Sequence, residues 1–348
     1  MISLASIQTA AETIQDHIIR TPIIHSPALS AMIGAEIYLK LENLKKTGSF
    51  KVRGATYKLT RRRNTIGPGG VVTASAGNHA QGVALAARET GIPATVVMPE
   101  WASISKQEST RSYGGEVVIY GTSLDEALDR ARELSREGRT FIHPFDDEDI
   151  VTGQGTIGLE ILEDVPDADV ILVPIGGGGL ISGIASAAQG IRPEAAIVGV
   201  EAAVCPSASE SRKAGEITRV DACASIADGI SVKQVGELCF NMIQEAVSDV
   251  VLVEEEQITA AMLMLLERKR ILAEGSGAAP LAALLNGSVV PPPGGKVVLV
   301  ISGGNVDSPL LGRIISQGLL KHGRIMRLRV RLEDIPGALP VCLPPWPG

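Results

Sequence analysis

The chain contains, at positions 170–180, the stretch Val-Ile-Leu-Val-Pro-Ile-Gly-Gly-Gly-Gly-Leu. Its first six residues are apolar and rich in β-branched side chains, which is typical of a strand buried on both faces of a parallel sheet. The four glycines predict a tight turn, and the uncharged residues that follow, up to Ile191, predict a helix. Pro174 and the glycines disfavour a membrane-spanning helix over this stretch. We therefore expect a buried strand, a glycine turn and a buried helix.

The same order of strand, small-residue turn and helix occurs at two other places. Residues 71–82 read Val-Val-Thr-Ala-Ser-Ala-Gly-Asn-His-Ala-Gln-Gly, and residues 297–305 read Val-Val-Leu-Val-Ile-Ser-Gly-Gly-Asn. Ligands of open parallel sheets bind beyond the carboxyl ends of the strands. Backbone N–H groups in such turns, together with a helix N-terminus, favour an anion. Four consecutive glycines suit a phosphate better than any packing requirement, so we expect a phosphate-bearing ligand at Gly176–Gly179.

Runs of β-branched residues alternate with helix-length segments along the whole chain. This alternation is typical of an α/β fold whose mostly parallel sheet is covered by helices on both faces. Hinges are expected at the glycine-rich residues 67–70 and the acidic residues 146–149. They separate a large domain, residues 1–64 and 146–322, from a small domain, residues 65–145. We expect strands at 37–41, 71–75, 94–98, 116–120, 170–175, 197–201, 250–253 and 297–302, and helices at 80–90, 123–137 and 256–272.

Composition excludes several classes of protein. Of the 348 residues, 45% are hydrophobic and 20% are charged, so the chain can bury a large core and is not a disordered chain or a coiled coil. A net charge of −7 and 3% aromatic residues disfavour a nucleic-acid partner, and no basic stripe indicates a membrane surface. The four cysteines form no C-x-x-C pair, and the first residues do not resemble a signal peptide. We expect a cytoplasmic protein with free thiols.

Common phosphate and hydrolase motifs are only partly matched. Gly177, Gly179 and Gly183, with Glu201 ending the next strand, resemble a dinucleotide fingerprint without its spacing. A nicotinamide-dependent dehydrogenase is therefore one alternative. The sequence contains no Walker A motif and no H-E-x-x-H motif, which weakens the hydrolase and zinc interpretations.

Lys51 supplies a different indication, in the stretch Thr-Gly-Ser-Phe-Lys-Val-Arg-Gly-Ala at 47–55. A lysine is usually a solvated surface cation, but this one lies among small residues and beside Phe50. Desolvation lowers the pKa of a lysine, which can then form a Schiff base with a carbonyl group. Pyridoxal phosphate combines an aldehyde with a phosphate dianion. It would require Lys51 and the tetraglycine turn to face one another.

Four motifs together closely resemble one enzyme family. They are Ser49–Gly54, Ser75–Gly82, Gly176–Leu180 and Ser302–Asn305, and they occur in the family's order and rough spacing. The family is the fold-type-II pyridoxal-phosphate group, which includes threonine ammonia-lyase (threonine dehydratase), serine dehydratase and serine racemase. The resemblance covers about residues 1–320, including 36–42 and 273–277. It implies two open, mostly parallel α/β domains with the cofactor in the cleft between them.

The resemblance also assigns roles to residues of this chain. Lys51 matches the lysine that binds the cofactor and takes the substrate Cα proton, and Phe50 the residue packed on the cofactor ring. Asn78 matches the partner of the ring hydroxyl, and Ser302 the residue facing the pyridine nitrogen. Gly176, Gly177, Gly178, Gly179 and Leu180 match the phosphate cup. The loop that receives the substrate carboxylate corresponds to Ser75, Ala76, Gly77, Asn78 and His79.

The implied reaction removes water from L-threonine or L-serine and yields a 2-oxo acid and ammonia. Racemases of this family place a serine just before the Gly-Asn pair, whereas this chain has Ala76, which cannot move a proton. We therefore favour an ammonia-lyase over a racemase, with a non-catalytic amino-acid sensor as a further alternative. The resemblance leaves open the choice between threonine and serine. It also leaves open whether the role lies in isoleucine biosynthesis or in catabolism. Relatives are usually homodimers or homotetramers.

Two departures from the family are visible. A divalent cation site of the racemases pairs the glutamate that ends a strand with an acidic residue six positions later. Glu201 matches the first, but Ser207 stands at the second, so a divalent or monovalent cation at Glu201 is doubtful.

Residues 323–339 resemble the opening strand and turn of an ACT regulatory domain, but too few residues follow to complete one. We expect no working effector site in this truncated ACT-like tail, residues 323–348.

Overall fold

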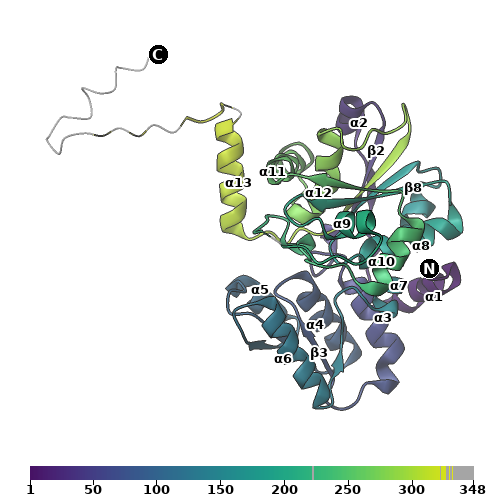
Figure 1. The fold of residues 1–348 in the computed structure, drawn as a ribbon, viewed down its shortest axis with the longest axis vertical. Coiled ribbons are helices and arrows are strands. Elements are labelled where there is room, and N and C mark those ends of the chain that lie inside the picture. Colours follow the sequence, from purple (N-terminus) through teal and green to yellow (C-terminus); the bar gives the residue numbers. More distant parts are fainter. Residues whose placement is uncertain (222, 322, 327–328, 330, 332–348) are drawn as a thin grey trace. The chain divides into compact units, whose positions relative to one another are not determined.

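The computed structural model describes residues 1–221, 223–321, 323–326, 329 and 331. The chain divides into two compact units, residues 1–307 and 308–348. The second unit contains one described helix, α13 (Ser308–Lys321). The resemblance to an ACT domain falls mainly on residues outside the described part. All further elements belong to the first unit (Figure 1).

Within residues 1–307 the helices and strands alternate as expected. The strands are β1 (Ile23–His25), β2 (Glu36–Leu41), β3 (Val71–Ala74), β4 (Ala94–Met98), β5 (Glu116–Ile119), β6 (Thr140–Phe141), β7 (Val170–Pro174), β8 (Ala196–Ala202), β9 (Asp249–Val253) and β10 (Lys296–Ile301). The longer helices are α1 (Leu4–Ile14), α2 (Pro27–Ile33), α3 (Val52–Arg62), α4 (Asn78–Thr90), α5 (Ile104–Ser112), α6 (Leu124–Arg136), α7 (Glu148–Asp164), α8 (Gly179–Ile191), α9 (Ser207–Ala214), α10 (Glu237–Ala246), α11 (Glu255–Met264) and α12 (Gly275–Leu285). Short turns of helix are η1 (Glu42–Leu44), η2 (Arg63–Thr65), η3 (Asp228–Ile230) and η4 (Leu265–Lys269).

The larger sheet has six strands in the order β1-β2-β10-β7-β8-β9. Only β1 runs antiparallel to its neighbour. Leu299 of β10 lies opposite Leu39 of β2 on one side and Leu172 of β7 on the other. Because the parallel strands share one direction, the turns after β2, β7 and β10 lie at the same edge of the sheet. These turns carry Lys51, the four glycines and Ser302.

The smaller sheet has four parallel strands in the order β5-β4-β3-β6. Alternate residues of β3 face opposite sides, as expected for a strand. Val71 packs with α3 and α4, whereas Val72 packs with α6. This sheet is built from residues 71–141, within the segment 65–145 predicted as the small domain.

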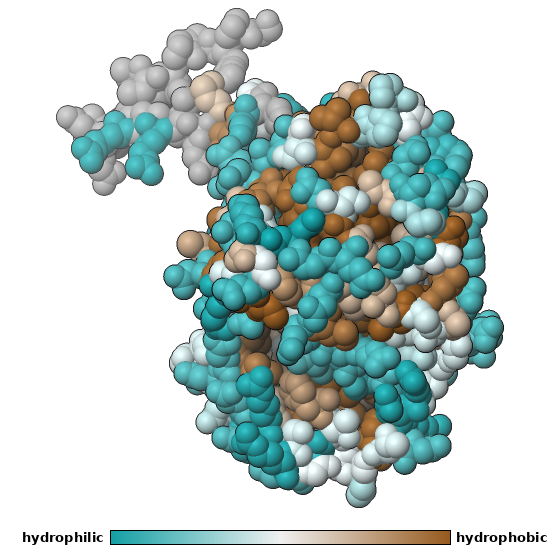
Figure 2. All heavy atoms as spheres, turned by 45° about the vertical axis from the view of Figure 1, so that its right-hand side comes forward, coloured by the Kyte–Doolittle hydropathy of each residue, from teal (hydrophilic) through white to brown (hydrophobic). Residues whose placement is uncertain are grey.

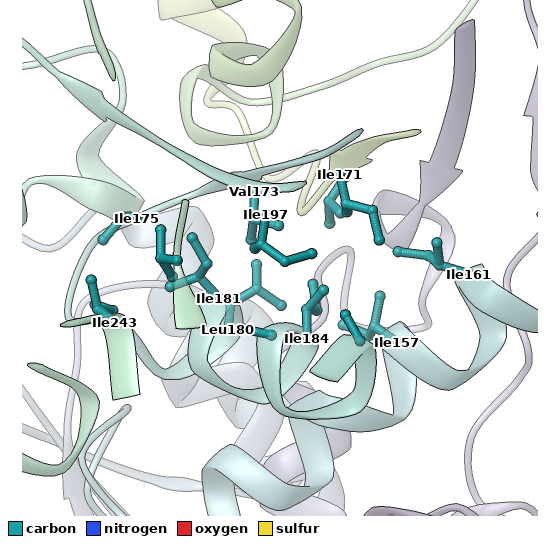
Figure 3. Packing of buried hydrophobic residues seen from close by; sticks show 14 of the residues in the cluster. Ile157, Ile161, Ile171, Val173, Ile175, Leu180, Ile181, Ile184, Ile197 and Ile243 are labelled. Atoms are coloured by element: carbon teal, nitrogen blue, oxygen red, sulfur yellow. The ribbon is translucent and has the colours of Figure 1, made fainter. Parts of the chain in front are cut away.

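The core of the larger sheet explains the apolar stretch at 170–191. Ile171, Val173 and Ile175 pack against Ile181 and Ile184 of α8 (Figure 3). The predicted strand, turn and helix are confirmed as β7, the glycine bend and α8. None of the helices in the described residues is both long enough and apolar enough to cross a bilayer. On the face shown in Figure 2, hydrophobic residues reach the surface in separate places among hydrophilic ones.

The expected strands agree with the structure to within one residue at either end, and two short strands, β1 and β6, were not expected. The helix expected at 256–272 is shorter than predicted. α11 ends at Met264, and a π-helical turn, η4, leads to Arg270, whose φ is 59°. A non-glycine residue in this left-handed region cannot continue a right-handed helix. Nothing in the local hydrophobic pattern signals that stop.

Candidate active site

The segment that carries Lys51 is fastened to the end of β10. Ser49 forms an isolated β-bridge with Gly303, and the Phe50 N–H donates to the carbonyl of Ser302 at 3.0 Å. Gly48 has a φ of 71°, and a Cβ there would lie 2.2 Å from Oδ1 of Asn305. The sequence therefore needs glycine at 48 to let the segment pass close to the turn after β10.

The amine of Lys51 is held away from bulk water. Its Nζ donates to the carbonyl oxygen of Pro144 at 2.8 Å and lies 5.2 Å from the centroid of the Phe50 ring. Burial lowers the pKa of Lys51 to about 8, although the nearby Cys239 and Glu274 oppose the change. A lysine with this pKa is partly unprotonated near neutral pH, as a nucleophilic amine must be.

The tetraglycine bend joins β7 to α8. Gly178, which precedes the first residue of α8, has a φ of 99°. Within the described residues, no protein group accepts a hydrogen bond from the backbone N–H groups of Gly176–Leu180. These donors at the N-terminus of a thirteen-residue helix suit a phosphate.

The glycines of the bend also meet a packing requirement. A Cβ at Gly177 would lie 2.2 Å from the ring of Phe145, and one at Gly179 would lie 2.8 Å from the Phe145 carbonyl oxygen. A Cβ at Gly178 would lie 2.7 Å from Cβ of Cys239. The bend therefore combines a packing requirement for glycine with backbone N–H groups that suit a phosphate.

Lys51 and the tetraglycine bend meet at one short turn, residues 143–147. Pro144 accepts the hydrogen bond from Lys51, and the adjacent Phe145 packs on Gly177. Nδ1 of His143 accepts from the backbone N–H groups of Phe145 and Asp146, at 3.3 and 2.8 Å. Asp146 in turn accepts from two backbone N–H groups at the start of α10. The predicted proximity of the amine and the bend is thus supported by their contacts with consecutive residues.

Asn78 brings the smaller sheet to the same place. It is the first residue of α4, directly after β3 and the turn 75–77. Its Nδ2 donates to Glu274 at 2.7 Å, and its Oδ1 accepts from Nδ2 of Asn305 at 2.7 Å. Nδ2 of Asn305 also donates to the carbonyl of Thr47 at 2.7 Å. One N–H of Asn78 stays available for a ligand.

The turn Ser75–His79 presents backbone donors. The hydroxyl of Ser75 accepts from the Gly77 N–H at 3.2 Å, and a Cβ at Gly77 would meet open space. No protein acceptor among the described residues takes the N–H groups of Asn78, His79 and Ala80. The His79 ring is buried against the carbonyl of Ile142, and burial lowers the pKa of His79 well below its ordinary value. His79 therefore offers its backbone, and Ala76 offers no proton donor.

Glu274 is a residue of the site to which the sequence assigned no role. It is buried, and burial with the neighbouring Asp228 raises its pKa to about 7, although Asn78 and Lys106 oppose the change. Its backbone N–H donates to the carbonyl of Gly303. The sequence shows a carboxylate between small residues at 273–277, but only the fold places it beside Asn78.

The carboxylate of Glu201 forms hydrogen bonds within the protein. Its two carboxylate oxygens accept from the backbone N–H groups of Ala208 and Ser209, both at 2.8 Å, in the first turn of α9. Burial raises the pKa of Glu201 to about 7. The described residues contain no group of three or more His, Cys, Asp or Glu side chains that could hold a metal ion. Glu201 therefore caps the N-terminus of α9.

These features coincide with a sequence match over most of the chain. Residues 14–303 match the family described as pyridoxal-phosphate dependent enzymes. The chain belongs to this family. Its α/β fold, with two open and mostly parallel sheets that meet at the site, agrees with that membership.

Curated relatives of this pyridoxal-phosphate dependent enzyme include an L-threonine ammonia-lyase from Thermotoga maritima. It is 47% identical over 340 residues, which cover 97% of this chain and 84% of the relative. A catabolic L-threonine dehydratase from Staphylococcus aureus is 44% identical over 255 residues, which cover 73% of this chain and 74% of the relative.

Solved structures in the same group include a threonine deaminase from T.th., with 39% identity and a TM-score of 0.83. That match covers 88% of this chain and 99% of the other. A serine racemase from maize has 36% identity and a TM-score of 0.86, covering 92% of this chain and 99% of the other. Lyases and racemases therefore share this fold.

The residues of the site fit the family's cofactor. The amine of Lys51 can meet an aldehyde, and the free N–H groups of the tetraglycine bend can bind a phosphate. The buried hydroxyls of Ser49 and Ser276 have no protein partner. Ser49 lies beside Gly303, and Ser276 lies beside Gly229. Orphaned buried donors of this kind are normally satisfied by a ligand or by water.

Replacing Glu274 by glutamine should change the pH dependence of this enzyme. Glutamine can still accept from Asn78 but carries no charge. Because Glu274 raises the pKa of Lys51 when ionised, we expect Glu274→Gln to make the amine available at lower pH. The pH midpoint for cofactor binding, followed by visible absorbance, should fall by about half a unit.

The free energy of unfolding should also depend on pH, in a direction that follows from the pKa of Glu274. The pKa of Glu274 in the folded state lies above its unfolded value, so the folded state binds the extra proton between about pH 4.5 and 7. Wild-type stability should therefore fall as the pH rises through this range, and Glu274→Gln should reduce that slope. Equal slopes in urea titrations of the two proteins would contradict the assignment.

Proposed function

We propose that this chain is an L-threonine/L-serine ammonia-lyase. The substrate loses water, and the unsaturated product is hydrolysed to ammonia and a 2-oxo acid: 2-oxobutyrate from threonine or pyruvate from serine. The observation that carries the proposal is the buried amine of Lys51, held at Pro144 beside the tetraglycine bend. The ammonia-lyase and dehydratase names of the curated relatives support the choice of reaction.

The bound cofactor supplies an aldehyde and a conjugated ring that withdraws electrons from the substrate Cα. The residues of this chain do the remaining work. Lys51 takes the Cα proton once its amine is free. The N–H groups of Gly176–Leu180 would bind the phosphate, and Phe50 would pack against the ring. Asn78, whose amide is held by Glu274 and Asn305, would donate its remaining N–H to the ring hydroxyl.

The substrate carboxylate has a matching site at the start of α4. The N–H groups of Asn78, His79 and Ala80 have no protein acceptor among the described residues, and the helix end favours an anion. With the carboxylate there and the amine at the cofactor, the Cα proton would face Lys51. Ala76 leaves the opposite face without an acid or base, which supports elimination over racemisation.

The test combines trapping with turnover. Borohydride should fix the cofactor on Lys51 irreversibly, and a tryptic digest should locate it there. The holoenzyme should then convert L-threonine or L-serine to the 2-oxo acid, measured with a coupled reductase. Trapping without turnover would favour an amino-acid sensor, and no trapping would contradict the assignment of Lys51.

A racemase is the second candidate, because the maize serine racemase covers 92% of this chain at a TM-score of 0.86. A chiral assay decides between them. We expect pyruvate to form from L-serine much faster than D-serine does. Equal rates would favour the racemase.

Replacing Ser302 by aspartate should redirect the reaction. Ser302 is buried directly after β10, and its hydroxyl is a weak proton donor, so a cofactor ring nitrogen held there would stay largely neutral. A carboxylate would hold that nitrogen protonated and favour side transamination. We expect Ser302→Asp to lower elimination and to raise the formation of aminated cofactor, measured by absorbance. Unchanged partitioning between the two products would contradict this role, and Ser302→Ala is the control for lost packing.

We propose further that the protein works in the cytoplasm as a homodimer or homotetramer, and that residues 65–145 move as a small domain. Three cysteines in the described residues, Cys205, Cys223 and Cys239, are free, which supports a reducing compartment. Sedimentation velocity of the holoenzyme measures the assembly.

A further inference from the structure

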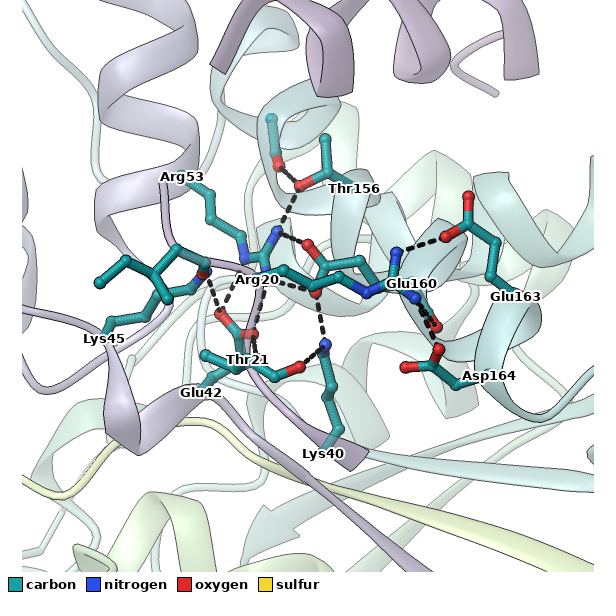
Figure 4. Close-up of polar contacts among 12 residues, drawn as sticks. Arg20, Thr21, Lys40, Glu42, Lys45, Arg53, Thr156, Glu160, Glu163 and Asp164 are labelled. Atoms are coloured by element: carbon teal, nitrogen blue, oxygen red, sulfur yellow. Dashed lines mark hydrogen bonds and ion pairs between the residues drawn. The ribbon is translucent and has the colours of Figure 1, made fainter. Parts of the chain in front are cut away.

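Five charged side chains, four of them buried, form a cluster next to the Lys51 segment, and the proposed reaction uses none of them. They are Lys40, Glu42, Lys45, Arg53 and Glu160 (Figure 4). Glu42 and Lys40 are 0% exposed, and Arg53 and Lys45 are 1% exposed. Three cations thus face two carboxylates in the interior. The cluster lies outside the catalytic groups described above.

Arg53 lies at the centre, and all five of its N–H groups are used. Nε and Nη2 donate to the two carboxylate oxygens of Glu42, each at 2.8 Å. Nη1 and Nη2 donate to the two oxygens of Glu160, each at 2.7 Å, and Nη1 also donates to Oγ1 of Thr156 at 3.0 Å. A planar guanidinium can make two such forks at once, and a lysine cannot.

The two buried lysines, Lys40 and Lys45, each pair with one of the carboxylates. Lys40 donates to the carbonyl of Thr21 at 2.7 Å and pairs with Glu160. Lys45 donates to the carbonyl of Ile19, and its Nζ lies 3.9 Å from Glu42. Burial lowers the pKa of Lys45 to about 8, as expected where buried cations outnumber carboxylates.

Such a cluster is a costly way to stabilise a fold. Taking several charges out of water costs much of what their attraction returns, and apolar residues of similar volume often stabilise a protein equally well. What apolar residues cannot do is join particular atoms of separate backbone segments through directional hydrogen bonds. We therefore ask which backbone segments the cluster joins.

Those segments are the two ends of the stretch that carries Lys51. Glu42 follows β2 directly and begins η1, and Arg53 lies in the first turn of α3, two residues after Lys51. Glu160 lies on α7, whose N-terminus follows the turn 143–147 that contacts the Lys51 amine. The cluster thus spans the residues before Lys51, the residues after it, and the helix that continues from its hydrogen-bond partner.

We propose that Arg53, held by Glu42 and Glu160, is a positioning residue for Lys51. It fixes the first turn of α3 relative to β2 and α7, so that Nζ of Lys51 stays at Pro144 beside the tetraglycine bend. The inference rests on the use of Lys51 in the proposed function.

A matched pair of substitutions separates positioning from charge balance. Arg53→Met and Lys40→Met each remove one buried cation and leave two cations facing two carboxylates. Only Arg53→Met releases the turn after Lys51. Because Arg53→Met leaves both carboxylates without the guanidinium and can fail to fold, Arg53→Lys is the second variant. Arg53→Lys keeps the positive charge but loses the bidentate hydrogen bonds to Glu42 and Glu160.

Four measurements on each holoenzyme and cofactor-free protein decide the outcome. They are the Tm of the cofactor-free protein, the fraction of cofactor trapped by borohydride, the pH midpoint of the visible absorbance, and kcat and KM for L-threonine. For Arg53→Lys we expect kcat to fall about 10- to 100-fold with KM changed less than about threefold. We also expect the pH midpoint to move by at least about half a unit. Lys40→Met should retain wild-type values of kcat and midpoint even where its Tm falls equally.

Wild-type kcat and midpoint in Arg53→Lys would overturn the proposal. The same changes in Lys40→Met at a matched Tm would also overturn it, because they would show a general structural effect. Failure of borohydride trapping in the wild-type enzyme would overturn the role of Lys51 instead, and this inference with it. Borohydride trapping in the wild-type enzyme therefore distinguishes a failure of the Arg53 proposal from a failure of the role assigned to Lys51.

Discussion

Replacing Lys51 by alanine is expected to abolish the reaction while leaving the fold intact. In the proposed mechanism the variant loses both the group that would bind the cofactor and the base that would take the Cα proton, so kcat should fall at least about a thousandfold. Stability should not fall, because the buried ammonium has no carboxylate within ion-pair distance among the described residues and its pKa is already lowered to about 8. Turnover of L-threonine, borohydride trapping and Tm measure the three effects.

Lys46→Ala is the matched control for that substitution. Lys46 lies five residues earlier, its side chain is 55% exposed, and it pairs with Glu89 at 3.4 Å. An exposed pair of this kind contributes at most about 1 kcal/mol, so activity and trapping should stay near wild type. Cofactor still trapped covalently in Lys51→Ala, at another lysine and with retained turnover, would refute the assignment.

Replacing Gly178 by alanine is expected to disrupt cofactor binding. The φ of 99° is unfavourable for alanine, and the new Cβ would lie 2.7 Å from Cβ of Cys239. Both effects would displace the N–H groups that we propose as the phosphate site, so the Kd for pyridoxal phosphate should rise at least about tenfold. A fluorescence titration with the cofactor measures it.

Gly34→Ala is the control for backbone strain alone. Gly34 has a φ of 81° at the end of α2, and a Cβ there would meet nothing within 4 Å. It should lose about 1 kcal/mol of stability, as a left-handed non-glycine residue does. Its cofactor affinity should stay at the wild-type value. Equal affinity losses in the two variants would show that stability, and not the bend, governs binding.

Much of the fold was predictable from the chain because its strands are continuous apolar runs. The stretch from Val170 to Ile191 could be divided correctly into a strand, a turn and a helix, because four glycines interrupt it. The three-residue strand β1 lacks that signal, because it depends on pairing with β2, where Ile24 lies opposite Leu39. The end of α11 depends on Arg270 in a left-handed conformation, which the identity of its side chain does not indicate.

Residues of the candidate site could be proposed from the sequence where they lie in short motifs, but not where residues distant in the sequence meet. Lys51 and the glycines stood out by their neighbours in the sequence. Glu274 lies 196 positions from Asn78, and the ring of Phe145 reaches Gly177 only through the fold. The same contact gives a packing reason for glycine at the proposed phosphate site. Sequence patterns indicate a turn's shape but not what fills the space around it.

The turn 143–147 has a consequence for engineering this enzyme. It follows β6, the last strand of the smaller sheet, and precedes α7 in the larger half, yet it supplies both Pro144 to the amine and Phe145 to the bend. A chimera that exchanged residues 71–141 with those of a homologue would replace the proposed substrate loop, residues 75–79, while Pro144 and Phe145 stayed native. Moving the crossover past residue 147 would also replace these two contacts to the amine and the bend.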